Sequence, residues 1–140
     1  MVTRVLVDAN VLVSFLTDRN SEQQALAAAL LEEAATGEVE VLVHQLTLSE
    51  VVFVLLKLYQ VPPEQVALYL RDLLRAPGAL LLSELSWTRL LELWPGEITA
   101  LTDAALAAVA MDLRNTSVAT FDQGLARALV RRGVRLHWPR

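Results

Sequence analysis

The chain has 140 residues, of which 54% are hydrophobic and 20% are charged, with no cysteine and a formal net charge of −4. This composition excludes intrinsic disorder, disulfides and Cys-based zinc sites, and it argues against nucleic-acid binding through bulk positive charge. No charge-free stretch exceeds nine residues, whereas a membrane span takes about 20 apolar residues, so we expect one cytoplasmic domain over residues 1–140.

In the first half of the chain, short apolar runs alternate with stretches that favour helices. The β-branched run at 51–56 fits either element, because its propensity alone is that of a strand. We predict a strand at 5–7, a helix at 11–17 capped by Asn10, a helix at 23–35 after a Ser21/Gln24 capping box and before Gly37, a strand at 39–43, and a helix from a Thr47/Glu50 capping box to about Tyr59.

In the second half, single prolines and glycines separate further elements of the same two kinds. The alternation of strands and helices predicts an α/β sandwich around a parallel sheet. We predict a helix from Pro63 to about Arg75, a strand at 79–82, a helix at 86–93 ended by Pro95-Gly96, a helix from Thr102-Asp103 to about Arg114, a strand at 116–120, a helix at 122–132 ended by Gly133, and a strand at 134–136.

Four acidic residues lie in apolar stretches of the sequence: Asp8, Glu50, Asp103 and Asp122. An ionised carboxylate in such surroundings is costly unless it is paired or binds a cation. The chain offers few partners, because Lys57 is its single lysine and no basic residue adjoins any of these acids. Asp8 and Asp122 follow predicted strands, and functional groups of open α/β sheets gather at the carboxyl ends of strands. The other two acids would open helices that follow loops, which can lie at the same edge.

Each of these acids, taken singly, is explained by a place in the first turn of a helix, where a carboxylate stabilises the helix by about 0.3–1 kcal/mol. Taken together at one sheet edge, the carboxylates would repel each other and raise each other's pKa. A divalent cation resolves this repulsion, and an all-oxygen ligand set suits Mg²⁺ or Mn²⁺. Such a cation held by carboxylates is a site for phosphodiester hydrolysis.

The chain resembles the PIN-domain nucleases, and within them the VapC-type toxins of bacterial toxin–antitoxin pairs. The motifs that carry the resemblance are VLVDANVLVSFL, TLSEVVFVL, LTDAALAAVA and VATFDQGL, which span nearly the whole chain. The resemblance implies a three-layer α/β sandwich with a five-stranded parallel sheet, and a Mg²⁺- or Mn²⁺-dependent endoribonuclease that cleaves single-stranded or loop RNA. It also implies a homodimer and an antitoxin partner that lies in a groove between the early helices.

The resemblance assigns roles to individual residues. The family's four acids map onto Asp8, Glu50, Asp103 and Asp122 as metal ligands and catalytic residues. Its supporting polar residues map onto Asn10, which would orient the loop of the first acid, and Thr120, which lies just before the last acid. Many family members carry a further acid two residues after the fourth, where this chain has Gly124, which implies one firmly held ion and a second that enters with substrate.

Several other readings remain open. Receiver domains also place acids at strand ends, but they need a lysine after the last strand, and Lys57 lies within a helix. Haloacid-dehalogenase-like phosphatases carry a second aspartate where this chain has Asn10. A catalytically silent PIN-like module that binds protein or RNA explains the fold but leaves the acids without a purpose. A housekeeping RNA-processing nuclease would show the same site as a toxin.

Residues outside the acid motifs suggest further surfaces. The segment 115–140 carries five arginines and one acid, so a local basic surface could contact phosphate, although a solvated helix face is as good an explanation. His44 at a strand end suits a structural role better than acid–base catalysis. Trp87 and Trp94 are seven residues apart, which predicts a shared helix face for packing or base stacking. The segment 137–139 would form a packed terminus or a contact surface. We expect a groove or dimer surface from Leu12, Phe15, Leu16 and the apolar face of 23–31.

Overall fold

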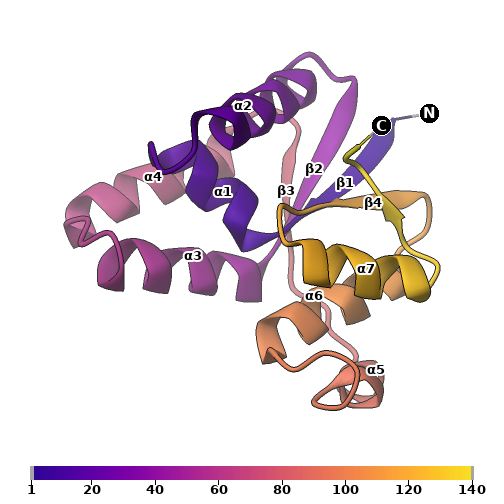
Figure 1. The fold of residues 1–140 in the computed structure, drawn as a ribbon. Coiled ribbons are helices and arrows are strands. Elements are labelled where there is room, and N and C mark those ends of the chain that lie inside the picture. Colours follow the sequence, from indigo (N-terminus) through magenta and orange to yellow (C-terminus); the bar gives the residue numbers. More distant parts are fainter. Residues whose placement is uncertain (1, 140) are drawn as a thin grey trace.

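A central sheet of parallel strands, flanked by helices on both faces, forms the computed structural model, which describes residues 2–139 (Figure 1). The strand order is β3–β2–β1–β4–β5, and every neighbouring pair is parallel. This confirms the predicted α/β sandwich with a five-stranded parallel sheet. The strands are β1 (Thr3–Val7), β2 (Val39–His44), β3 (Ala79–Leu82), β4 (Thr116–Ala119) and β5 (Arg135–Leu136). The helices are α1 (Ala9–Leu16), α2 (Ser21–Ala35), α3 (Gln45–Lys57), α4 (Pro63–Arg75), α5 (Trp87–Leu93), α6 (Leu101–Asp112) and α7 (Gln123–Arg131).

The order of the strands determines which face each helix covers. The chain moves outward from β1 to β2 and β3, then returns past β1 to β4 and continues to β5. Because parallel crossovers are right-handed, reversing the direction moves the connecting helices to the opposite face. Figure 1 shows α1–α4 on one side of the sheet and α5–α7 on the other. Alternate side chains of β1 enter the two cores, since Val5 and Val7 pack with α1–α4 and Leu6 packs with α5–α7.

The topology brings the ends of β1 and β4 together at the centre of the sheet. Val7 is paired with Ala119 at the last register position, and the backbone N–H of Asp8 donates to the carbonyl of Ala119 at 2.9 Å. The segments that follow these strands, including Thr120 and Asp122, therefore leave the sheet side by side. This is the point of an open α/β sheet where functional groups are expected to gather.

The caps of two helices differ from the prediction. Helix α1 is capped by Asp8, whose Oδ1 accepts from the N–H of Ala9, so the prediction of Asn10 as the cap was wrong. Helix α3 begins at Gln45, three residues before the predicted opening, because Nδ1 of His44 accepts from the N–H of Leu46. Asp8 directly follows β1 and His44 is the last residue of β2, so at most one residue separates each strand from the helix that it precedes.

The other differences between prediction and structure are small shifts of helix ends, together with one larger correction that concerns Leu12. The run at 51–56 lies wholly inside α3, so the strand alternative is excluded. Helix α6 starts at Leu101 and ends at Asp112, and α2 is capped by Asn20, whose Oδ1 accepts from Gln23. Leu12 is 1% exposed and belongs to the core, so the prediction that it forms a surface was wrong.

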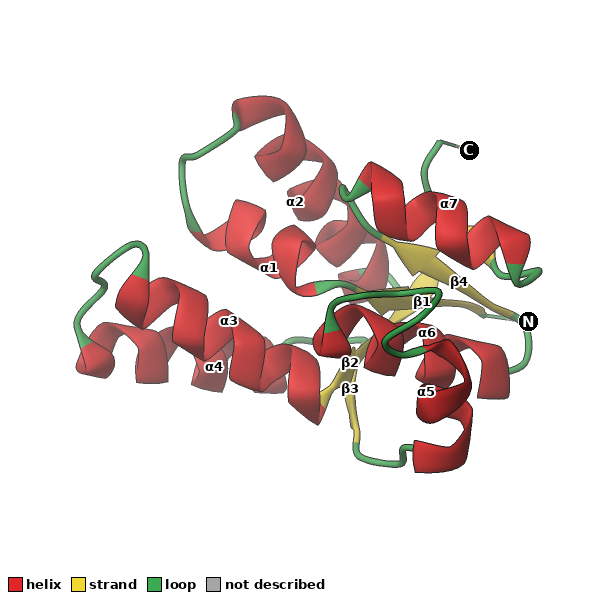
Figure 2. Ribbon diagram, turned by 60° about the horizontal axis from the view of Figure 1, so that its bottom comes forward, coloured by secondary structure: helices red, strands yellow, loops and turns green. Residues whose placement is uncertain are grey.

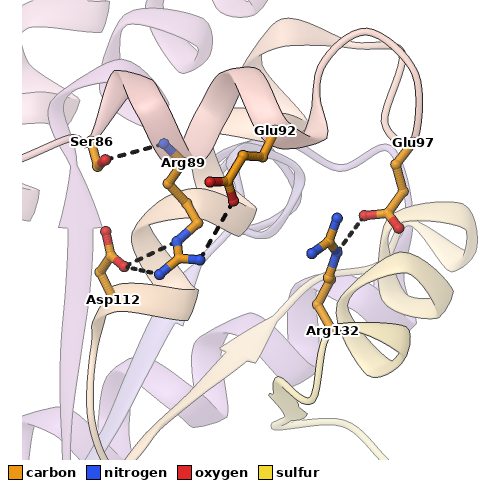
Figure 3. A network of polar contacts seen from close by, with 6 residues as sticks. All are labelled: Ser86, Arg89, Glu92, Glu97, Asp112 and Arg132. Atoms are coloured by element: carbon orange, nitrogen blue, oxygen red, sulfur yellow. Dashed lines mark hydrogen bonds and ion pairs between the residues drawn. The ribbon is translucent and has the colours of Figure 1, made fainter.

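A network of polar contacts joins α5 and the loop after it to α6 and α7 (Figure 3). Arg89 in α5 bonds Asp112 at the end of α6 at 3.3 Å, and Ser86 accepts from the N–H of Arg89 as the cap of α5. Arg132 donates to Glu97 at 2.6 Å. These contacts fix the short helix α5 against the longer ones.

Figure 2 shows α3 and α4 side by side in an arm that extends away from the sheet. Along residues 2–139, every helix is too short or too polar to cross a membrane.

Candidate active site

The four acids singled out from the sequence line one cleft of about 210 Å³ at the carboxyl ends of the central strands. They come from four different helices, since Asp8 and Asp122 cap α1 and α7 while Glu50 and Asp103 lie in α3 and α6. Asn10 lines the same cleft. The structure therefore brings together acids that are up to 114 positions apart in the sequence.

Asp8 is the most deeply placed of these acids, with 6% of the residue exposed. Its Oδ1 accepts from the N–H of Ala9 and its Oδ2 accepts from the hydroxyl of Thr120, both at 2.7 Å. Burial raises the pKa of Asp8 to about 6, although both hydrogen bonds act to lower it. The charges of Glu50 and Asp122 raise this pKa further. Both oxygens of the carboxylate are thus oriented by the protein before any ligand arrives.

Thr120 and Asn10 make polar contacts beside Asp8 and Asp122. The Thr120 hydroxyl, which donates to Asp8, also accepts from the N–H of Asp122 at 3.0 Å and from the amide of Asn10 at 3.4 Å. The side-chain oxygen of Asn10 accepts from the N–H of Phe121 at 3.2 Å. The segment after β4 is therefore tied to the start of α1 through polar side chains. Oδ1 of Asp122 caps α7, and its other carboxylate oxygen takes no part in the cap.

Asp103 is the acid with the fewest favourable contacts. It is half-buried in the first turn of α6. Among residues 2–139, no donor lies within hydrogen-bond or ion-pair distance of its carboxylate. Burial raises the pKa of Asp103 to about 7, and the charges of Asp8, Asp122 and Glu50 raise it further, in that order of size. Glu50 is better placed, because its Oε1 accepts from the Thr102 hydroxyl at 3.1 Å.

The chemistry of this donor set suits a hard divalent cation. The carboxylates act on one another through space, and a half-buried acid without a donor is stabilised by a cation rather than by a further hydrogen bond. Across the described range 2–139, no three acidic or histidine side chains converge tightly enough to make a ready-made ion site. The site is therefore an open acidic cleft that the four acids line together.

The cleft is also lined by residues that the sequence did not single out. Arg19 follows α1 and reaches into the cleft, and Tyr59 follows α3 and forms part of its rim beside Val54 and Leu58. Neither residue belongs to an acid motif, so only the packing of α1 against α3 reveals their place. The signal available in the sequence was the single arginine that closely follows the first acidic motif.

Other residues considered from the sequence have structural roles or lie away from the cleft. His44 is buried, and its Nε2 bonds the carbonyl of Glu84 at 2.9 Å, which agrees with a structural role. Trp94 lies beyond the end of α5 and its indole donates to Thr99, so the prediction of a helix face shared with Trp87 was wrong. Trp138 stacks on Phe121 with ring centres 4.9 Å apart, which packs the end of the chain against the loop after β4.

The predicted basic segment is partly neutralised. Arg132 is paired with Glu97, and Arg140 lies outside the described residues. Arg127 lies near the acidic cleft, because a Cβ built on Gly124 would be 4.0 Å from its Nη2 and 3.3 Å from Oδ1 of Asp122. Gly124 thus lies directly beside the Asp122 carboxylate.

Comparison with known proteins agrees with this geometry. Residues 5–129 match the model of the PIN domain family. No curated protein matches the sequence. Among solved structures, a chain of VapBC2 from Rickettsia felis bound to a DNA fragment from their promoter is 15% identical, with a TM-score of 0.65, and the match covers 96% of this chain and 97% of that one. The PIN domain endonuclease Utp24 is 13% identical, with a TM-score of 0.48, over 90% of this chain and 76% of that one. The family match covers β2, β3, β4, most of β1 and all the acids of the cleft, and the chain therefore belongs to the PIN domain family.

Proposed function

We propose that this chain is a Mg²⁺- or Mn²⁺-dependent endoribonuclease and the toxin of a toxin–antitoxin pair. The observation that carries the proposal is Asp103, a half-buried carboxylate without a donor that faces three other acids across one cleft. Such an arrangement destabilises the fold unless a cation is bound, which favours a metal centre in this member of the PIN domain family.

The residues of the chain would divide the work of hydrolysis. Asp8, Glu50, Asp103 and Asp122 would hold the cation, with Asp8 oriented by Thr120. When bound, the cation offsets negative charge on the phosphodiester and activates a water for attack on phosphorus. Glu50 is fixed through one oxygen by Thr102, which leaves the other oxygen to orient that water. Hydrolysis would join the water oxygen to phosphorus and break the bond from phosphorus to a ribose oxygen. The proton that the water loses would be balanced by one that the leaving oxygen takes up from solvent.

Calorimetric titration of Mn²⁺ tests the metal centre without a need for the right RNA. The wild-type chain and Asp72→Asn, an exposed acid of α4 outside the cleft, are expected to bind Mn²⁺ saturably. Asp103→Asn is expected to lose this binding. These three proteins and Asp8→Asn are then incubated with a pool of RNAs, where only Asp103→Asn and Asp8→Asn should fail to cleave. Cleavage by either of these cleft variants would overturn the assignment of the acids.

A catalytically silent binding module is the second candidate. It is favoured by the absence, among residues 2–139, of a ready-made cluster of ion ligands. The two candidates separate in the titration, because a silent module binds no Mn²⁺ and cleaves no RNA in any of the variants. A result of that kind would make RNA or protein binding the leading function.

The toxin role is supported by the fold match to a chain of VapBC2, which covers 96% of this chain and 97% of that one. Expression of the wild-type chain in a bacterial host should arrest growth, whereas expression of Asp103→Asn should not. Growth unaffected by an active nuclease would point instead to a housekeeping role in RNA processing.

Association with an antitoxin and with a second copy is part of the proposal. Helices α3 and α4, with the residue that ends α3, expose four large apolar side chains to solvent, namely Phe53, Leu58, Leu68 and Leu74. Burial of such a patch in an interface is the usual reason for its presence. We expect a dimer in size-exclusion chromatography at micromolar concentration, and a monomer at that concentration would contradict this part of the proposal.

A further inference from the structure

We propose that Arg19 binds the backbone phosphate of the nucleotide next to the one that is cleaved, with the base of that nucleotide packed on Tyr59. The inference rests on the proposed ribonuclease function and adds to it a substrate-binding subsite. Both residues line the acidic cleft, Arg19 from the segment between α1 and α2, and Tyr59 from the segment between α3 and α4.

The guanidinium of Arg19 is held in place by uncharged groups. Its Nε donates to the hydroxyl of Ser14 at 2.9 Å and its Nη2 donates to the carbonyl of Asn10 at 3.0 Å. Ser14 is fully buried, and its hydroxyl donates in turn to Oε1 of Gln23 at 2.9 Å. A long, exposed arginine would otherwise sample many rotamers, so these contacts remove much of the entropy that a ligand would have to overcome.

The positive charge of Arg19 has no protein partner. Within residues 2–139, none of the ion pairs involves Arg19, although acids line the same cleft. The two bonds to Ser14 and Asn10 use two of the five N–H groups, and the remaining three include both hydrogens of Nη1. A planar fork of free N–H groups matches the oxygens of a phosphate. The scissile phosphate would lie at the four acids. Because Arg19 makes no ion pair with these acids, it suits the neighbouring phosphate of the RNA backbone rather than the scissile one.

The surroundings of Arg19 also fit a nucleotide. Tyr59 is 38% exposed and stands at the cleft beside Val54 and Leu58, so the wall is apolar where Arg19 does not reach. Aromatic side chains of this kind stack bases with little regard to sequence. An acidic peptide could also use the free guanidinium, but it would bring further negative charge into a cleft of four carboxylates without a base for Tyr59.

The test measures binding of single-stranded RNAs of randomised sequence in the presence of EDTA. The RNAs carry fluorescein, and fluorescence anisotropy reports binding at each of a series of NaCl concentrations. Arg19→Ala should weaken binding about tenfold, as expected for one hydrogen-bonded charge, and should reduce the slope of log K against log salt by about 0.7. Arg19→Lys should keep the slope and lose part of the affinity, because it keeps the charge without the fork. Tyr59→Ala should weaken binding about tenfold with an unchanged slope, since stacking releases no counterions.

Arg71→Ala is the matched control, because Arg71 is an exposed arginine of α4 outside the cleft. It should bind as the wild type does. In cleavage assays with Mn²⁺, Arg19→Ala should raise KM while kcat is kept, as for a contact made equally in the ground and transition states.

The outcomes separate the two proposals. If the wild-type chain binds RNA and Arg19→Ala binds equally with the same slope, the phosphate subsite is wrong and the ribonuclease function stands. If the wild-type chain shows neither RNA binding nor cleavage, the ribonuclease function is wrong and the subsite is wrong with it.

Discussion

The hydroxyl of Thr120 donates to Oδ2 of Asp8 at 2.7 Å, across the ends of β4 and β1. The same hydroxyl oxygen accepts from the N–H of Asp122 at 3.0 Å. One small side chain thus orients the most buried acid of the cleft and the turn that carries another. The cleft is built on this link between the two central strands.

Replacement of Thr120 by valine keeps the shape of the side chain and removes this donor. We expect the pKa of Asp8 to rise further, because the hydrogen bond now lowers it. The free energy of unfolding should fall by about 1–3 kcal/mol at neutral pH, the usual effect of leaving a buried charged group without its donor. Urea denaturation measures this change. Thr120→Ser keeps the hydroxyl and serves as the control, and equal stability of the valine and serine variants would contradict the role of the bond.

The stability of the metal-free protein should fall as pH rises. The pKa of Asp103 is raised from 3.8 to about 7, so the folded state binds this proton more tightly than the unfolded state does. The free energy of unfolding therefore decreases between about pH 4 and pH 7 and levels off above that range. Asp103→Asn removes the effect and should be more stable than the wild type at neutral pH, by on the order of 1 kcal/mol after allowance for solvent screening of a half-exposed group.

Thermal denaturation in EDTA over this pH range checks the linkage. The melting temperatures of wild type and Asp103→Asn should converge at the acidic end and separate toward neutral pH. Parallel curves for the two proteins would show that the acid is not destabilised in the folded state.

The position of Leu12 in the core can be tested by truncation. Leu12 is 1% exposed, whereas Leu26 on the next helix is 43% exposed. Leu12→Ala should lower the free energy of unfolding by about 2–5 kcal/mol, as for other buried leucines. Leu26→Ala should cost well under half as much. A small effect at Leu12 would mean that α1 does not pack as the structure places it.

Two glycines with the same backbone geometry allow strain and steric contact to be separated. Gly37 and Gly78 have φ of +85° and +80°, but a Cβ on Gly37 meets nothing within 4 Å and one on Gly78 would lie 2.4 Å from the carbonyl oxygen of Ala34. Gly37→Ala should cost about 1–2 kcal/mol through its backbone alone. Gly78→Ala should cost clearly more, because α2 and the turn before β3 must move apart. Chemical denaturation compares the two variants, and Gly96→Ala, which meets open space without a positive φ, is the control.

Much of the fold could be predicted from local pattern. The run at 79–82 forms β3 with the predicted boundaries, because a short apolar run between a proline–glycine turn and a polar segment has few alternatives. The acids could be found because a carboxylate in an apolar stretch conflicts with its surroundings. Leu12 could not be placed, because most of α1 is apolar and its polar residues do not mark the solvent face, since Ser14 is itself fully buried. Arg19 stands out in sequence only as an arginine that closely follows the first acidic motif, and its place in the cleft depends on how α1 packs against α3.

The caps of α1 and α7 have a mechanical consequence. Oδ1 of Asp8 is bonded to the first turn of α1 and Oδ1 of Asp122 to the first turn of α7, so neither carboxylate can swing freely. Helix α1 belongs to the layer on one face of the sheet and α7 to the layer on the other. A ligand that changes the distance between these two carboxylates must therefore break a cap or shift the two layers against each other. In the second case, binding in the cleft would move the outer surfaces of both helical layers.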